Sequence, residues 1–173
     1  VEAFFGAGAA SGPLDLETVR EAFATMTSPG RLETVRSSPT IVIDAAHNPH
    51  GMAASVKAIE ESFDFRRLVA VVATFADKDV LGMLQALEPL TAEIVVTQNS
   101  SPRSMLVDDL AAVAVDVFGA DRVTVEPRLD DAIEAAVRLA EDPDDEVVVG
   151  VGVLITGSVV TAGEARLLLG AGK

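Results

Sequence analysis

The stretch "TIVIDAAHNPHGMAASVKAIEES", residues 40–62, decides the fold class of this chain of 173 residues. It opens with a β-branched run at residues 40–43, and residues 50–62 have the pattern of a helix. Asn48 and Pro49 lie between the two, where a proline is already set for the first helical turn. The stretch therefore predicts a short buried strand that leads directly into a helix.

The same strand–helix alternation continues to the end of the chain. Apolar strand-like runs occupy residues 40–43, 67–73, 93–97, 122–126 and 146–155. Helical patterns occupy residues 50–62, 80–88, 106–118, 129–141 and 159–169. The strand runs are continuously apolar, which is typical of a parallel sheet covered on both faces. The alternation thus predicts a doubly wound α/β domain with a mostly parallel sheet.

The first 39 residues have a different character. Four apolar residues recur there at helical spacing: Leu16, Val19, Phe23 and Met26. The following "TSPGR" ends that pattern. We predict that residues 1–27 are the tail of a preceding domain, that residues 28–39 are an interdomain linker, and that residues 40–173 form the α/β domain.

The composition excludes several classes of partner. Thirteen basic and 27 acidic residues give a net charge of −14, which disfavours nucleic acid and anionic membranes. The absence of Cys excludes disulfides and thiolate metal sites, and it fits a cytoplasmic protein. No apolar run approaches the roughly 18–20 residues that span a bilayer, and the N-terminal residues lack the basic start of a signal peptide.

The candidate functional residues follow the predicted strands, because ligands of doubly wound sheets bind outside the carboxyl ends of the strands. They are Asp44, His47 and Asn48 after the first strand, Asp77, Lys78 and Asp79 after the second, Arg103 after the third, Arg128 after the fourth and Ser158 after the last. Each has a plainer reading. Asp79 and Ser158 are natural helix N-caps, Arg103 could be a solvated loop residue, and His47 could equally pack within its loop.

The residues that a catalytic triad, a phosphate loop or a zinc site would need are missing from the sequence. There is no serine elbow and no thiol for a catalytic triad, and no GxxxxGK[ST] phosphate loop. His47 and His50 flank Asn-Pro without further marked ligands, so a zinc site is not predicted. From the residues alone, the chain is an α/β domain with an acidic, histidine and asparagine cluster but no complete catalytic apparatus.

Five motifs nevertheless occur in a familiar order. They are "SPGRLE" (28–33), "IDAAHNPHG" (43–51), "DKD" (77–79), "SPR" (101–103) and "TGSVVTAGEAR" (156–166). Together they resemble folylpolyglutamate synthase/dihydrofolate synthase, a branch of the Mur-type ATP-dependent amide ligases. The resemblance is to the Rossmann-like C-terminal domain of that family, with Ala45 where the family usually has a glycine.

The resemblance implies a reaction. In this family ATP, with Mg²⁺, phosphorylates a carboxylate of folate or dihydropteroate, and the amine of L-glutamate attacks the acyl phosphate. The phosphate loop and the magnesium ligands belong to a domain outside these residues. The resemblance therefore implies that no metal site and no complete catalytic set lie here, that the isolated domain is inactive, and that the enzyme is a monomer.

The resemblance also implies roles for individual residues. Those implied for ATP are Arg31 at the γ-phosphate or acyl phosphate, Asp44 at the ribose, and His47 at the base or a phosphate. Asn48 is implied either to orient that loop or to touch the nucleotide. Those implied for glutamate or for phosphate positioning are Ser158 and Lys78. His50 is expected to be a bystander in the first helical turn.

Two other readings stay open. One is the C-terminal domain of a Mur ligase that acts on a peptidoglycan precursor, although the His-Asn-Pro string argues against it. The other is a stand-alone nucleotide-binding or protein-interaction module. Within the leading reading, the sequence leaves open whether the parent enzyme adds the first glutamate, extends a polyglutamate tail, or does both.

Overall fold

The computed structural model describes residues 16–17, 20, 28–141 and 150–171. Of the helix predicted near the N-terminus, Leu16, Glu17 and Arg20 are helical and exposed, and Arg20 donates to Glu17 at 2.7 Å. The rest of the predicted tail lies outside the described residues, and so do residues 146–149 at the start of the last predicted strand. No helix in the described part of the chain is long and apolar enough to cross a membrane.

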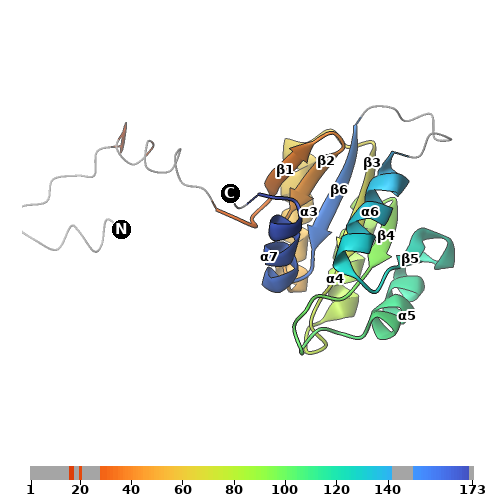
Figure 1. Ribbon diagram of the computed structural model, residues 1–173. Coiled ribbons are helices and arrows are strands. Elements are labelled where there is room, and N and C mark those ends of the chain that lie inside the picture. Colours follow the sequence, from red (N-terminus) through yellow and green to blue (C-terminus); the bar gives the residue numbers. More distant parts are fainter. Residues whose placement is uncertain (1–15, 18–19, 21–27, 142–149, 172–173) are drawn as a thin grey trace, which may run out of the picture.

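A single six-stranded sheet forms the centre of the fold (Figure 1). Its strands are β1 (Glu33–Ser37), β2 (Thr40–Ile43), β3 (Arg67–Val72), β4 (Glu93–Val96), β5 (Val123–Val125) and β6 (Val151–Thr156). They lie in the order β1-β2-β6-β3-β4-β5, and only the β1–β2 pair is antiparallel. The predicted mostly parallel sheet is confirmed.

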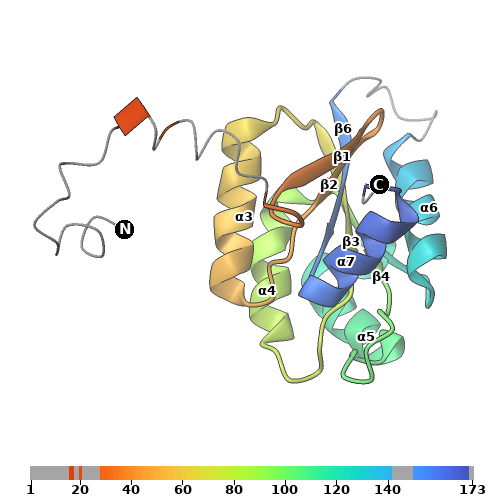
Figure 2. The ribbon, with the colours of Figure 1, turned by 60° about the vertical axis from the view of Figure 1, so that its left-hand side comes forward.

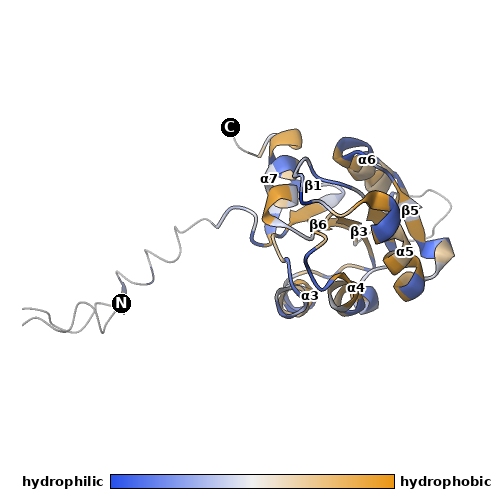
Figure 3. Cartoon of the chain, turned by 90° about the horizontal axis from the view of Figure 1, so that it is seen from below, coloured by the Kyte–Doolittle hydropathy of each residue, from blue (hydrophilic) through white to orange (hydrophobic). Residues whose placement is uncertain are grey.

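Helices cover both faces of the sheet (Figures 2 and 3). They are α3 (Pro49–Ser62), α4 (Val80–Leu87), α5 (Val107–Phe118), α6 (Leu129–Ala140) and α7 (Val159–Leu168), with short 3₁₀ turns η1 (Glu88–Leu90) and η2 (Ala120–Arg122). One face carries α3, α4 and α5, and the other carries α6 and α7. The doubly wound arrangement is therefore confirmed.

The two-faced sheet explains why the strands are continuously apolar. In β6, Leu154 packs into the core beneath α3, α4 and α5, whereas Val153 and Ile155 pack beneath α6 and α7. All three side chains are fully buried. Successive residues of a strand point to opposite faces, so a strand covered on both faces needs an apolar residue at every position.

The strand β1 was not predicted, because it lies inside the segment assigned to the linker. Its sequence, ETVRS, contains one apolar residue, Val35, which packs against the core beneath α6 and α7. An edge strand has one neighbour and one partly covered face, so it lacks the apolar run by which the inner strands are recognised. The sheet thus begins at Glu33, within residues 28–39.

Candidate functional site

The carboxyl ends of four neighbouring strands, β2, β6, β3 and β4, meet at one edge of the sheet. This edge faces the viewer in Figure 3. The first residues after these strands are bonded to one another. Asp44 N donates to Ile155 O at 2.9 Å, Gly157 N to Ala46 O at 3.2 Å, and Ala73 N to Thr156 O at 3.3 Å. The loops after β2, β6 and β3 therefore form one connected surface, which we call the carboxyl edge.

Asp44 anchors this edge from below. Its side chain is 3% exposed, and its carboxylate accepts from Leu32 N at 3.2 Å, Ala46 N at 3.0 Å and Ser55 Oγ at 2.6 Å. The three donors belong to three segments: the turn before β1, the loop after β2, and α3. This geometry supports a positioning role for Asp44, whereas its predicted contact with ribose hydroxyls stays a prediction.

Arg31 lies in the turn that Asp44 holds. The turn closes through Arg31 N, which donates to Ser28 O at 3.0 Å, and Gly30 adopts a positive φ of 71°. Ala45 N donates to Gly30 O at 2.8 Å, so the turn rests on the loop after β2. The Arg31 side chain is exposed, and its guanidinium has no ion pair or hydrogen bond within the described residues. It is therefore available to a ligand.

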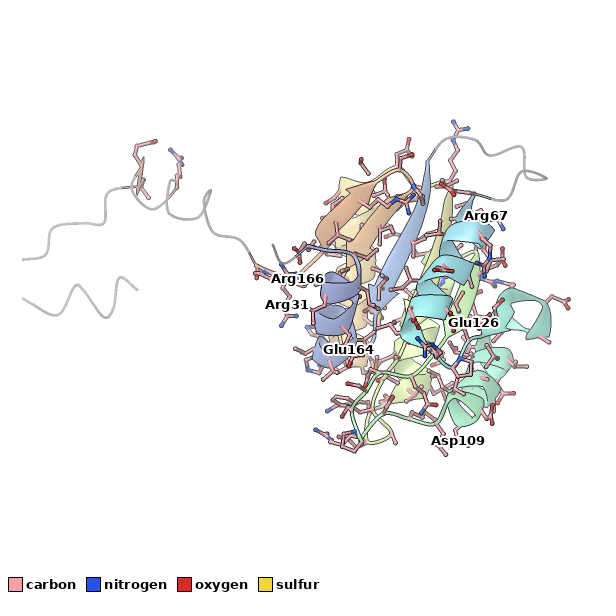
Figure 4. The ribbon with its side chains drawn as sticks, in the orientation of Figure 1. Arg31, Arg67, Asp109, Glu126, Glu164 and Arg166 are labelled. Atoms are coloured by element: carbon pink, nitrogen blue, oxygen red, sulfur yellow. The ribbon has the colours of Figure 1, made fainter. Side chains whose placement is uncertain are left out.

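A second contact holds this turn from the side of α7. Arg166 donates to Glu33 through Nε at 2.6 Å and Nη2 at 3.1 Å, and Glu33 Oε2 accepts from Gly30 N at 2.8 Å. Figure 4 shows Arg31 on the same side of the fold as α7, which carries Arg166 and Glu164. The Arg166 guanidinium lowers the pKa of Glu33 below its ordinary value of 4.5. The pair is three-quarters buried, which makes it stronger than a fully exposed ion pair.

This pair predicts a pH dependence of stability. Since the folded state lowers the pKa of Glu33, its contribution to the free energy of unfolding is complete above about 4.5 and declines as pH falls through the folded-state pKa. Urea unfolding of wild type and Glu33→Gln between about pH 6 and about pH 3 should give a difference that shrinks in acid. Glu134→Gln, which removes an exposed partner of Arg138 on α6, is the control and should show a much smaller difference. A difference for Glu33→Gln that does not change with pH would contradict the assignment.

His47 and Asn48 follow Asp44 on the same loop. The Nδ1 atom of His47 lies 3.0 Å from Ala45 O. A carbonyl can only accept, so Nδ1 carries the proton and Nε2 is left to accept from, or when protonated donate to, a ligand. Asn48 is exposed and caps α3, because its Oδ1 accepts from Gly51 N at 2.8 Å. Its predicted role in orienting the loop has a structural basis here, while a direct nucleotide contact stays a prediction.

Lys78 lies in the loop after β3, beside the loop after β4. Arg103 Nη2 donates to Asp77 at 2.8 and 2.9 Å and stacks over Phe75 at 4.6 Å, and Lys78 Nζ lies 3.5 Å from Asp77. Arg103 lowers the pKa of Asp77. Asp79 caps α4 through Gly82 N at 2.9 Å, so the plainer reading of Asp79 is confirmed. The two loops therefore present two cations around one carboxylate.

Ser158 is buried and caps α7, which confirms its plainer reading too. Thr161 Oγ1 donates to Ala73 O at 2.9 Å, so in the 2.8 Å contact between the two hydroxyls Ser158 must be the donor. Ser158 Oγ also accepts from Thr161 N at 3.0 Å and from Asn99 Nδ2 at 3.2 Å. Its hydrogen and both lone pairs are therefore occupied, and the hydroxyl ties the loops after β6 and β4 together.

The structure thus groups the predicted residues in two places. Arg31, Asp44, His47 and Asn48 lie on two turns that are bonded to each other, and Lys78 lies with Arg103 farther along the edge. Residues that the sequence analysis did not assign hold these groups in place: Glu33, Ser55, Asn99, Thr161, Glu164 and Arg166. Four of them lie inside the five quoted motifs, but their partners lie far away in the sequence. Among the described residues, no three His, Asp or Glu side chains form a group that could hold a metal ion.

Comparison with known proteins identifies the family. Residues 30–157 match the family described as Mur ligase, glutamate ligase domain. The chain belongs to this Mur ligase family. It is 52% identical, over 98% of its length, to the dihydrofolate synthase/folylpolyglutamate synthase of Mycobacterium tuberculosis. The chain spans about a third of that relative, 36% of its length.

Solved structures of similar proteins agree with this assignment. The folylpolyglutamate synthase of M. tuberculosis, complexed with ADP and AMPPCP, matches with a TM-score of 0.91 and 51% identity over 98% of the chain and 37% of that protein. An Escherichia coli enzyme in complex with DHPP and ADP matches with a TM-score of 0.77 over 93% of the chain and 36% of that protein. At 22% identity, that second likeness concerns the fold. The resemblance found in the motifs is therefore confirmed.

Proposed function

We propose that the chain is the glutamate ligase domain of a cytoplasmic, ATP-dependent ligase that joins L-glutamate to folate or dihydropteroate through an acyl phosphate. The observation that carries the proposal is Arg31, an exposed guanidinium without a protein partner among the described residues, on a turn fixed by two carboxylates. The relative from M. tuberculosis, which bears the name of such an enzyme, supports the choice of folate over a peptidoglycan precursor.

In this proposal Arg31 binds the γ-phosphate of ATP and then the acyl phosphate. The net charge of −14 repels a nucleotide, so local cations must provide the attraction. A guanidinium is permanently charged and presents a rigid fork of donors that suits phosphate oxygens. Asp44 fixes the turn from one side and Glu33 from the other, so the backbone that carries the fork is in place before the transition state forms.

His47 supplies a second contact to the nucleotide. Its Nδ1 is committed to Ala45 O, which orients the ring and leaves Nε2 for a ligand. Because Asn48 caps α3 from the next position, the loop cannot shift without exposing the helix end. We therefore assign Asp44 and Asn48 to positioning, and Arg31 and His47 to direct contact with ATP.

For glutamate we propose Lys78 and Arg103. The Ser158 hydroxyl has all its hydrogen-bonding capacity occupied within the protein, so it holds loops rather than substrate in this proposal. Lys78 and Arg103 together outweigh Asp77 by one positive charge, which suits a carboxylate of glutamate. Reaching Arg103 requires only that a ligand approach its exposed side chain, which is 60% accessible.

Magnesium and the phosphate loop have no counterpart in this proposal among the described residues. Mg²⁺ prefers carboxylates and water, yet Asp44 is engaged by three protein donors and Asp77 by Arg103 and Lys78. We propose that the remainder of a longer enzyme, matching the two-thirds of the relative that this chain does not cover, supplies those groups and the folate pocket. The turn at residues 28–32 then moves as part of this domain, with residues 1–27 as the tail of the preceding domain and the whole enzyme as a monomer.

The proposal predicts how the chain behaves alone. We expect it to fold, to bind ATP weakly, and to hydrolyse none, because the contacts of Arg31 and His47 remain while the phosphate loop does not. Titration with ATP should shift the NMR amide signals of His47 and Gly157 at the carboxyl edge, and leave those of Arg67 and Glu93 at the opposite end unchanged. ATP hydrolysis by this chain alone would contradict the proposal and favour an independent module.

A further inference from the structure

The helix α7 contacts the turn that carries Arg31 and the loop that carries Arg103, through two residues of the motif at residues 156–166. Arg166 reaches the turn before β1, where Glu33 connects it to Gly30, the residue next to Arg31. Glu164 reaches the loop after β4, where Ser100 N donates to both of its carboxylate oxygens, at 3.1 and 3.3 Å, and Ser100 Oγ donates to Oε1. These contacts span 133 and 64 residues of sequence.

The spacing of the two residues explains how one helix serves two loops. Side chains two positions apart on an α-helix are rotated by about 200° around its axis, so they point to nearly opposite sides. Figure 4 shows Glu164 and Arg166 at different levels of α7. α7 itself is fixed at its N-terminus, where Thr161 donates to Ala73 O and Ser158 accepts from Asn99. The helix therefore has a fixed position, with the Arg166 side chain directed toward the turn before β1 and the Glu164 side chain toward the loop after β4.

The segments that Arg166 and Glu164 contact each carry a cationic side chain, Arg31 in one and Arg103 in the other. On one side, Glu33 accepts from Gly30 N at 2.8 Å while Arg166 binds its carboxylate through two nitrogens. On the other side, Ser100 is followed by Ser101, whose Oγ accepts from Arg103 N at 3.2 Å. Neither Glu164 nor Arg166 lies among the residues that we assign to substrate contact.

We propose that α7 is a bridge that sets the positions of Arg31 and Arg103 relative to each other, with Arg166 as the positioning residue for the ATP site and Glu164 as the positioning residue for the glutamate site. This inference rests on the proposed function. It adds that the two substrate sites are tuned separately from one helix. A small displacement of either arginine matters, because about 1 Å of misplacement can reduce a rate on the order of a hundredfold.

The test measures, in the full-length ligase, whether the two substitutions change two different Michaelis constants. Arg166→Gln should raise KM for ATP on the order of tenfold and leave KM for glutamate within about twofold, and Glu164→Gln should do the reverse. Arg166→Lys keeps the charge without the fork, so its KM for ATP should fall between wild type and Arg166→Gln. A general loss of structure would move both constants together, which would overturn the proposal.

Controls separate this inference from the function on which it rests. Arg138→Gln and Glu134→Gln break an exposed pair on α6 and should leave both constants unchanged. Arg31→Ala and Arg103→Ala remove the positioned groups themselves. If these two leave kcat, KM for ATP and KM for glutamate all unchanged, the proposed function fails. If they act as expected while Glu164→Gln and Arg166→Gln have no selective effect, the bridge proposal alone fails.

Discussion

Arg31→Ala should lower kcat of the full-length ligase by on the order of a hundredfold or more. A guanidinium that stabilises charge on a transferring phosphoryl group contributes on the order of 10³–10⁵ in comparable sites, and one lost donor to a developing oxyanion about 10²–10³. The melting temperature should not change, because the Arg31 side chain is exposed and has no partner within the described residues. Steady-state kinetics and circular dichroism melts measure the two effects.

Two further variants make this result specific. Arg31→Lys should recover only part of the rate, since an ammonium cannot bind two phosphate oxygens as a fork does. Arg36→Ala is the matched control: this arginine lies in the same strand region, but its Nε donates to Ser38 O at the other end of β1. It should keep wild-type kcat. An Arg31→Ala enzyme with full activity at limiting ATP would remove the basis of the proposed function.

Asp44→Ala should destabilise the domain by about 3 kcal/mol or more, the second large effect. The substitution leaves Leu32 N and Ala46 N without their acceptor in a site that is 3% exposed, while Ser55 Oγ keeps only Gly51 O. A buried donor left unsatisfied costs about 1–3 kcal/mol. Urea unfolding followed by circular dichroism measures the loss, because the chain has no Trp or Tyr for fluorescence.

Smaller changes at the same site give a graded control. Ser55→Ala removes one donor and should cost only about 0.5–1.5 kcal/mol, since Ser55 Oγ also bonds Gly51 O at 3.0 Å. Asp44→Asn should be intermediate, because an amide keeps one acceptor oxygen. If Asp44→Ala unfolds like wild type but loses ATP affinity, Asp44 binds the ribose and does not act through the Arg31 turn.

The fold was largely predictable because its signals are local. The four inner strands are apolar at nearly every position, which is what two covered faces require, and the helices begin at recognisable caps such as Asp79 and Ser158. The edge strand β1 has neither signal. Its place in the sheet depends on pairing with β2, and a single apolar residue, Val35, marks it in the sequence.

The sequence shows which polar residues follow the strand ends, and it shows less of how these residues are held. Residues directly after strands, such as His47 and Lys78, could be found from the position of the strand ends. Burial could not. Asp44 and Ser158 look like ligand groups in the sequence, yet protein donors and acceptors occupy both in the folded chain. The long-range partners of Glu33 and Glu164 follow only from the path of α7 across the sheet.

Transfer of radiolabelled glutamate by the full-length protein tests the central claim most directly. With ATP and Mg²⁺, we predict labelled glutamyl products on folate or dihydropteroate, one ADP released per amide formed, and loss of this transfer in Arg31→Ala. The 173-residue chain alone should form no product. Equal transfer by wild type and Arg31→Ala, or transfer only to a peptidoglycan precursor, would contradict the account.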